Sequence, residues 1–187
     1  MKKTLLSLSL SMVLGVACAK ECKGVDFPEQ IHLDSSSLVL NGLGLRLATM
    51  FKVSVYVAAL YVPKPTSDAT AILGTDTAKQ MVLHFVRNVG VDDLRNGWTE
   101  GFQKNAKGTL PALKDRIATF NSWMGDMKTG QRVTLTYRPG AGVEVNVNHA
   151  AKGTITGDDF AKALFAIWLG DPPNPEIKTG LMGGACG

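Results

Sequence analysis

The segment Leu40–Val62, LNGLGLRLATMFKVSVYVAALYV, limits the possible folds of this chain more than any other part of the sequence. From Phe51 to Val62 the residues fit the two-residue period of a β-strand. One face of that strand would carry Val53, Val55, Val57, Ala59 and Tyr61, and the other Ser54, Tyr56, Ala58 and Leu60. Because both faces are mostly apolar, the sequence predicts a central strand that is covered on both sides.

One charged residue stands in front of this apolar run. Arg46 is the only charged side chain between Asp34 and Lys52, and a guanidinium does not lose its proton. Shorter apolar segments, Leu38–Leu40 and Leu45–Leu47, flank the residues NGLG, and we expect these glycines to interrupt the strand there.

The sequence leaves two interpretations open for Arg46 and two for Tyr56. Arg46 could be a strand-end arginine paired with Asp34, Asp92 or Asp93, or it could face a ligand. Tyr56 could be a core tyrosine whose hydroxyl bonds to a backbone carbonyl, or it could belong to the same site.

The rest of the chain alternates between strand and helix patterns. We expect strands at Met81–Arg87, Arg132–Tyr137 and Val143–Val147, the last two joined by RPGAG as a hairpin. Helical spacing is found from Val91, from Leu110 and from Asp158. Strands early and late, with helices between and after them, predict an α+β fold in which helices pack on one face of a largely antiparallel sheet.

The first residues resemble an export signal. Lys2 and Lys3 precede an apolar stretch from Leu5 to Val16 that is too short for an ordinary membrane helix. Ala17 and Ala19 give the small-x-small pattern of a signal peptidase site, so residues 1–19 are interpreted as a signal peptide and residues 20–187 as a single domain. The mature protein would be periplasmic or secreted, with no membrane span; the alternative is a lipoprotein anchored at Cys18.

Charge and cysteine content exclude several classes of function. Removal of Lys2 and Lys3 lowers the basic residues from 20 to 18 against 16 acidic ones, so the mature chain, at a net charge of +2, lacks a nucleic-acid-binding charge. Cys22 and Cys186 remain at opposite ends, either as a disulfide or as two free thiols. Neither cysteine nor histidine spacing indicates a metal site, and we expect no metal and no cofactor.

Four segments in this order, GLGLR…FKVSVYVAALYV, HFVRNV…LRNGWTEGF, LTYRPGAGVEV and GTITGDDFAKALFAIWLGDPP, resemble the chalcone isomerase-like family, most closely its exported bacterial members. The resemblance covers nearly all of the mature chain. It implies an open-faced β-sandwich: a large antiparallel sheet with helices packed on one face and a ligand cleft between them. The family includes isomerases that close a chalcone to a flavanone and relatives that bind a fatty acid without turnover.

The resemblance also assigns residues to the cleft. Arg46 corresponds to the family's cleft arginine, and Tyr56 to a strand position that is threonine in the isomerases and tyrosine in the binding proteins. Arg87 lies where the isomerases often carry a lysine. The helix tyrosine and asparagine of the isomerase site correspond to Leu94 and about Gly101, which offer no hydroxyl or amide for proton handling.

We therefore expect a non-catalytic protein that binds a small apolar carboxylate, such as a fatty acid, through Arg46, Tyr56 and Arg87. The sequence leaves both a binding protein and an enzyme open. The alternative is an isomerase, or intramolecular lyase, of the chalcone–flavanone type, in which Arg46 would be the catalytic residue.

Overall fold

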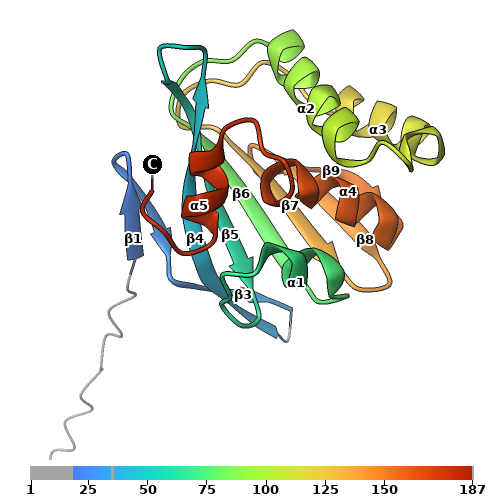
Figure 1. Cartoon of the computed structure of the whole chain (residues 1–187), viewed down its shortest axis with the longest axis horizontal. Helices are drawn as coiled ribbons and strands as arrows, with labels where there is room; N and C mark the ends of the chain where they lie inside the picture. Colours follow the sequence, from blue (N-terminus) through green and yellow to red (C-terminus); the bar gives the residue numbers. More distant parts are fainter. Residues whose placement is uncertain (1–18, 35, 187) are drawn as a thin grey trace, which may run out of the picture.

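The computed structural model describes residues 19–34 and 36–186, and its centre is a seven-stranded antiparallel sheet (Figure 1). The strands follow one another in the sheet in the order of the sequence, from β3 to β9. They are β3 (Gln30–Leu33), β4 (Ser36–Ala48), β5 (Val53–Val62), β6 (Lys79–Phe85), β7 (Arg132–Arg138), β8 (Gly142–Val147) and β9 (Ala150–Ile155). This meander, with β5 and β6 in its interior, confirms the predicted α+β architecture with a largely antiparallel sheet.

Helices pack on one face of the sheet, as Figure 1 shows. They are α1 (Ala69–Gly74), α2 (Val91–Asn105), α3 (Leu110–Ser122), α4 (Asp158–Leu169) and α5 (Pro175–Leu181). The main hydrophobic cluster joins them to Tyr56, Ala58 and Leu60 of β5. Nine of the twelve residues of α4 are buried, so this helix is the centre of the helical layer.

The other face of the sheet is covered only in part. A separate hairpin of β1 (Ala19–Cys22) and β2 (Val25–Pro28) brings Phe27 into a second cluster with Val57, Ala59 and Tyr61 of β5. Farther along, at β6–β8, this face is polar: Arg132 Nε donates a hydrogen bond of 2.8 Å to His84 Nδ1. The sandwich is therefore open on one side.

The expected break at NGLG is wrong, because β4 runs without interruption through both glycines. A Cβ on Gly42 would lie 2.1 Å from the carbonyl oxygen of Gly180, and one on Gly44 would lie 2.2 Å from that of Ile177. The glycines therefore allow α5 to lie directly on the strand. Asn41 is an extra residue, a bulge in the pairing with β5, and its side chain bonds to the backbone of Leu181 and Thr66.

Other boundaries also differ from the sequence-based expectation. Phe51 lies in the β4–β5 turn and β5 begins at Val53; β6 ends at Phe85 instead of Arg87. Strands β1, β2 and β3 were not predicted, because their four-residue segments are too short to show a period. Asp68 caps α1, where its carboxylate accepts hydrogen bonds from the backbone N–H groups of Thr70 and Ala71.

The structure joins Cys22 to Cys186 in a disulfide, with the two Cα atoms 6.0 Å apart. The bond fastens the β1–β2 hairpin to the chain that follows α5, since Cys186 packs against the second cluster. Within residues 19–34 and 36–186, no helix is long and apolar enough to cross a membrane. Most of the predicted signal peptide, and Cys18 with it, lies outside the described residues.

Loss of the disulfide should destabilise the protein. The bond spans 164 residues of sequence, and cross-links over long loops stabilise proteins by about 2–4 kcal/mol. We expect the double variant Cys22→Ser/Cys186→Ser to lose about that much free energy of unfolding in a denaturant titration. Reduced wild type should match the variant. Equal stability of oxidised wild type and variant, or thiol labelling of both cysteines without reductant, would contradict the bond.

Candidate functional site

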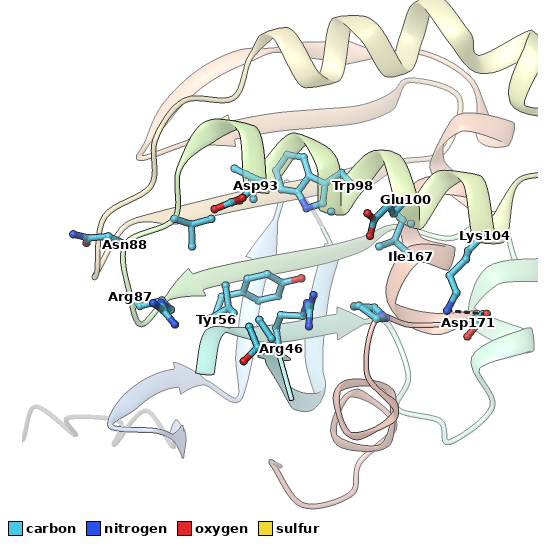
Figure 2. Close-up of a pocket in the computed structure, with 18 residues that line it drawn as sticks. Arg46, Tyr56, Arg87, Asn88, Asp93, Trp98, Glu100, Lys104, Ile167 and Asp171 are labelled. Atoms are coloured by element: carbon cyan, nitrogen blue, oxygen red, sulfur yellow. Dashed lines mark ion pairs between the residues drawn. The ribbon is translucent and has the colours of Figure 1, made fainter. Parts of the chain in front are cut away.

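A cavity of about 580 Å³ opens where the β4–β5 hairpin meets α2 and the end of α4 (Figure 2). Strands β4 and β5 form one wall, and the loop after β6 closes one end. One face of α2 forms the other wall, with residues at helical spacing: Asp93, Leu94, Gly97, Trp98, Glu100, Gly101 and Lys104. Lys104 comes eleven positions after Asp93, so the cavity follows α2 for about 16 Å.

Arg46 lies on the sheet wall of this cavity. It pairs with Tyr56 across the β4–β5 ladder, after which the register shifts and leaves Val55 as an extra residue. Asn174 holds the backbone at this shift from the opposite side. Its Nδ2 donates to the Leu45 carbonyl at 3.1 Å, and its Oδ1 accepts from the Leu47 N–H at 3.0 Å. The backbone on both sides of Arg46 is thereby fixed.

The structural interpretation of Arg46 as half of an ion pair is not supported. Among the described residues, no carboxylate lies within ion-pair distance of its guanidinium, and its Nη1 donates only to the Leu47 carbonyl. Asp34, one of the partners considered, pairs with Arg138 at 2.8 Å. The half-buried guanidinium therefore keeps donors that face the cavity.

Tyr56 is 5% exposed, and its ring lies beside Arg46 in Figure 2. Its hydroxyl accepts a hydrogen bond of 2.9 Å from the indole Nε1 of Trp168, a residue of α4. Among the described residues it donates to no backbone carbonyl. No described residue accepts the hydroxyl proton, so the phenol can donate it into the cavity. Burial raises the pKa of Tyr56, although the Trp168 hydrogen bond and the charge of Arg46 both oppose the rise.

The remaining charges lie around the mouth. Arg87, two residues past the end of β6, is exposed and lines the same cavity. On the opposite wall, Asp93 and Glu100 are exposed on α2, and Lys104 pairs with Asp171 at 3.1 Å. The structure thus brings Arg46, Tyr56 and Arg87 to one cavity, with Arg46 and Arg87 on the sheet side and Asp93, Glu100 and the ion-paired Lys104 on the helix side.

Small and apolar residues shape the interior of the cavity. A Cβ on Gly97 would meet no atom within 4 Å, whereas one on Gly101 would lie 2.7 Å from the Ile167 side chain. Phe102 and Phe120 do not line the cavity; they pack edge to face in the core, with ring centroids 6.2 Å apart. These two rings occupy the interior beneath α2 and α3, and the cavity is a groove along α2.

Sequence reasoning did not assign roles to Trp168 and Asn174. Trp168 lies on the buried stripe of α4, where its spacing is that of any core residue. Asn174 precedes Pro175 and is the N-cap residue of α5, but its side chain makes no capping bond and bonds to β4 instead. No periodic pattern distinguishes such a residue, because the contact spans about 130 residues.

Comparisons with known proteins agree with this architecture. A family model described as chalcone isomerase-like matches residues 19–183. The crystal structure of a fatty-acid binding protein from Arabidopsis thaliana is similar, with a TM-score of 0.72 and 16% sequence identity; the match covers 88% of this chain and 95% of that one. At this identity the likeness shows the fold alone. No curated protein matches the sequence.

The burial of the tyrosines predicts that they ionise at a higher pH in the folded protein than in the unfolded chain. The chain has three tyrosines. Burial is the main cause of a raised pKa in each: it raises the pKa of Tyr56, and it raises the pKa values of Tyr61 and Tyr137 to about 12. In a pH titration followed by tyrosinate absorbance, the tyrosine hydroxyls of the folded protein should stay protonated at pH about 10, where the tyrosines of an unfolded chain titrate.

The native state then holds more protons than the unfolded chain above that pH, so stability should fall as the pH rises further. Tyr56→Phe should remove one late-titrating group. A tyrosine that ionises near pH 10 in the folded wild type, and is absent from Tyr56→Phe, would show that Tyr56 is not buried as described.

Proposed function

The chain belongs to the chalcone isomerase-like family, and we propose that it binds an apolar carboxylate of the fatty-acid type without turnover. The observation that carries the proposal is the Arg46 guanidinium. It lines an apolar groove without a carboxylate partner among the described residues, next to the phenol of Tyr56. A ligand carboxylate would supply the missing negative charge and accept hydrogen bonds from the Arg46 guanidinium and the Tyr56 hydroxyl.

Simple energetics support this pairing. A charge-assisted hydrogen bond contributes about 1.5–3 kcal/mol, and each buried methylene of an acyl chain adds about 0.8 kcal/mol. The groove volume of about 580 Å³ is within the usual range of about 300–1,000 Å³ for small-ligand sites. Arg87, which is more exposed, would add long-range attraction for an anion at the mouth.

Two cavity positions favour binding over catalysis. Leu94 and Gly101 both line the groove, and by the family resemblance they replace a tyrosine and an asparagine of the isomerases. Neither can position water or move a proton. The structural relative from Arabidopsis thaliana is itself a fatty-acid binding protein, which agrees with the proposal. Conversion of a chalcone above the background rate, lost in Arg46→Ala, would instead favour the isomerase.

We also propose that the protein is exported, and that residues 1–19 are removed. The support is the basic and apolar start of the sequence followed by Ala17 and Ala19, together with a disulfide of the kind that persists in oxidising compartments. The N-terminal residue of the protein isolated from the cell envelope tests this: Lys20 is expected, and a lipid-modified Cys18 would identify the lipoprotein alternative.

The decisive experiment measures binding of a long-chain fatty acid and of its methyl ester to wild type and Arg46→Ala. Wild type should bind the acid at least tenfold more tightly than the ester, since about 1.4 kcal/mol corresponds to tenfold. Arg46→Ala should lose that preference and keep its ester affinity. Tyr56→Phe should weaken acid binding by a smaller factor, because one neutral donor is lost.

Two variants serve as controls. Lys107→Ala removes an exposed cation that does not line the groove, so its acid affinity should equal that of wild type. Gly97→Leu adds a side chain where the structure has open space, so it should weaken acid and ester alike while the protein stays folded. A wild type that binds acid and ester equally would refute the role of Arg46.

A further inference from the structure

The turn between β4 and β5 exposes two large apolar side chains. Met50 is 88% exposed and Phe51 83%, and they are the exposed large hydrophobic residues of the described chain. In Figure 1 this hairpin stands at the end of the sheet opposite α1. Contiguous exposed apolar side chains can mark a contact site with a protein or a membrane.

The turn holds the two side chains outward. The Lys52 N–H donates to the Thr49 carbonyl at 3.1 Å, and Thr49 and Lys52 have φ values of 62° and 51°. A positive φ is unfavourable for a β-branched residue such as threonine. The Thr49–Lys52 hydrogen bond closes a tight turn, and Met50 and Phe51 lie at its outermost point.

The same turn borders the groove. Ala48 and Thr49, the residues directly before Met50, line the cavity together with Arg46. A surface that received Met50 and Phe51 would thus meet the mouth of the groove. An apolar ligand could then pass between that surface and the groove with little exposure to water.

The size of the patch decides what kind of partner it fits. One aromatic side chain buries about 150–250 Å², so two side chains fall well short of the roughly 800 Å² per partner that a stable protein interface needs. A lipid bilayer has no such requirement, because a few apolar side chains insert between headgroups while the rest of the protein stays in water.

The charge of the hairpin fits the same partner. No Asp or Glu occurs between Asp34 and Asp68, so β4, β5 and their turn carry only the cations Arg46 and Lys52. Lys52 reaches Glu176 at 2.9 Å, yet its side chain remains 71% exposed. Cations beside an apolar tip favour anionic phospholipid headgroups.

We infer that the β4–β5 tip, formed by Met50 and Phe51, docks on an anionic lipid bilayer and presents the mouth of the groove to it. The contact itself does not depend on what the groove binds. Its use for ligand transfer rests on the proposed function.

Vesicle co-sedimentation tests the contact. The chain from Ala19 is suitable, because all described strands, helices and hydrophobic clusters lie within residues 19–186. Wild type should bind vesicles of phosphatidylglycerol mixed with phosphatidylcholine, and bind pure phosphatidylcholine less. The double variant Met50→Ser/Phe51→Ser should bind at least about tenfold more weakly, since it loses the inserted apolar surface. Its melting temperature should not change, because both side chains are exposed.

A conservative variant separates insertion from a general surface effect. Phe51→Trp should keep vesicle binding, and its added fluorescence should shift to shorter wavelength with vesicles. Lys107→Ala should bind as wild type does. A wild type that does not bind vesicles, or a double variant that binds equally, would overturn the inference. So would a wild-type dimer in sedimentation equilibrium that the double variant abolishes, because the partner would then be a second copy.

Fatty-acid binding in the absence of vesicles separates the two proposals. The double variant should bind soluble fatty acid as wild type does, because neither Met50 nor Phe51 lines the groove. Vesicle binding without fatty-acid binding would leave the docking tip standing and refute the ligand. Fatty-acid binding without vesicle binding would refute the docking tip and leave the proposed ligand standing.

Discussion

The chemistry of the groove depends on one permanent positive charge, the Arg46 guanidinium, at the edge of an apolar core. Removing a guanidinium from water is costly unless a partner compensates for the lost hydration. Arg46 is half-buried and has no carboxylate partner among the described residues. Under the proposed function, the carboxylate of the ligand is the partner of this guanidinium, and its hydrocarbon part packs against the apolar residues of the groove.

The rest of the fold holds that charge in place. Gly42 and Gly44 let α5 lie on β4, and this contact brings Asn174 to the backbone on both sides of Arg46. From the other side, Trp168 of α4 fixes the hydroxyl of Tyr56. The last two helices of the chain therefore position the Arg46 and Tyr56 end of a cavity whose sheet wall is the β4–β5 hairpin.

The sequence predicted the parts of this arrangement that follow from local patterns. Alternation along β5 assigned Tyr56 and Val57 to opposite faces, and they belong to different hydrophobic clusters on the two sides of the sheet. Family resemblance, rather than periodicity, supplied the particular architecture and selected Arg46.

Long-range contacts explain what was missed. Gly42 and Gly44 were interpreted as a break in the strand. The reason that glycine is needed at these positions is the close approach of the α5 backbone, which lies more than 130 residues away in the sequence. The bulge at Val55, which sets Arg46 beside Tyr56, has no sequence signal, and Trp168 cannot be distinguished from its neighbours on the buried stripe of α4.

The ionisation of a bound fatty acid tests the central claim most directly. A fatty acid with a carbon-13 label at its carboxyl group can be titrated by NMR while it is bound to the protein. An adjacent guanidinium should hold the pKa of that carboxyl below its value in water, and Arg46→Ala should raise it, because burial then acts alone. A bound carboxyl whose pKa equals or exceeds its value in water, and does not respond to the substitution, would contradict the account.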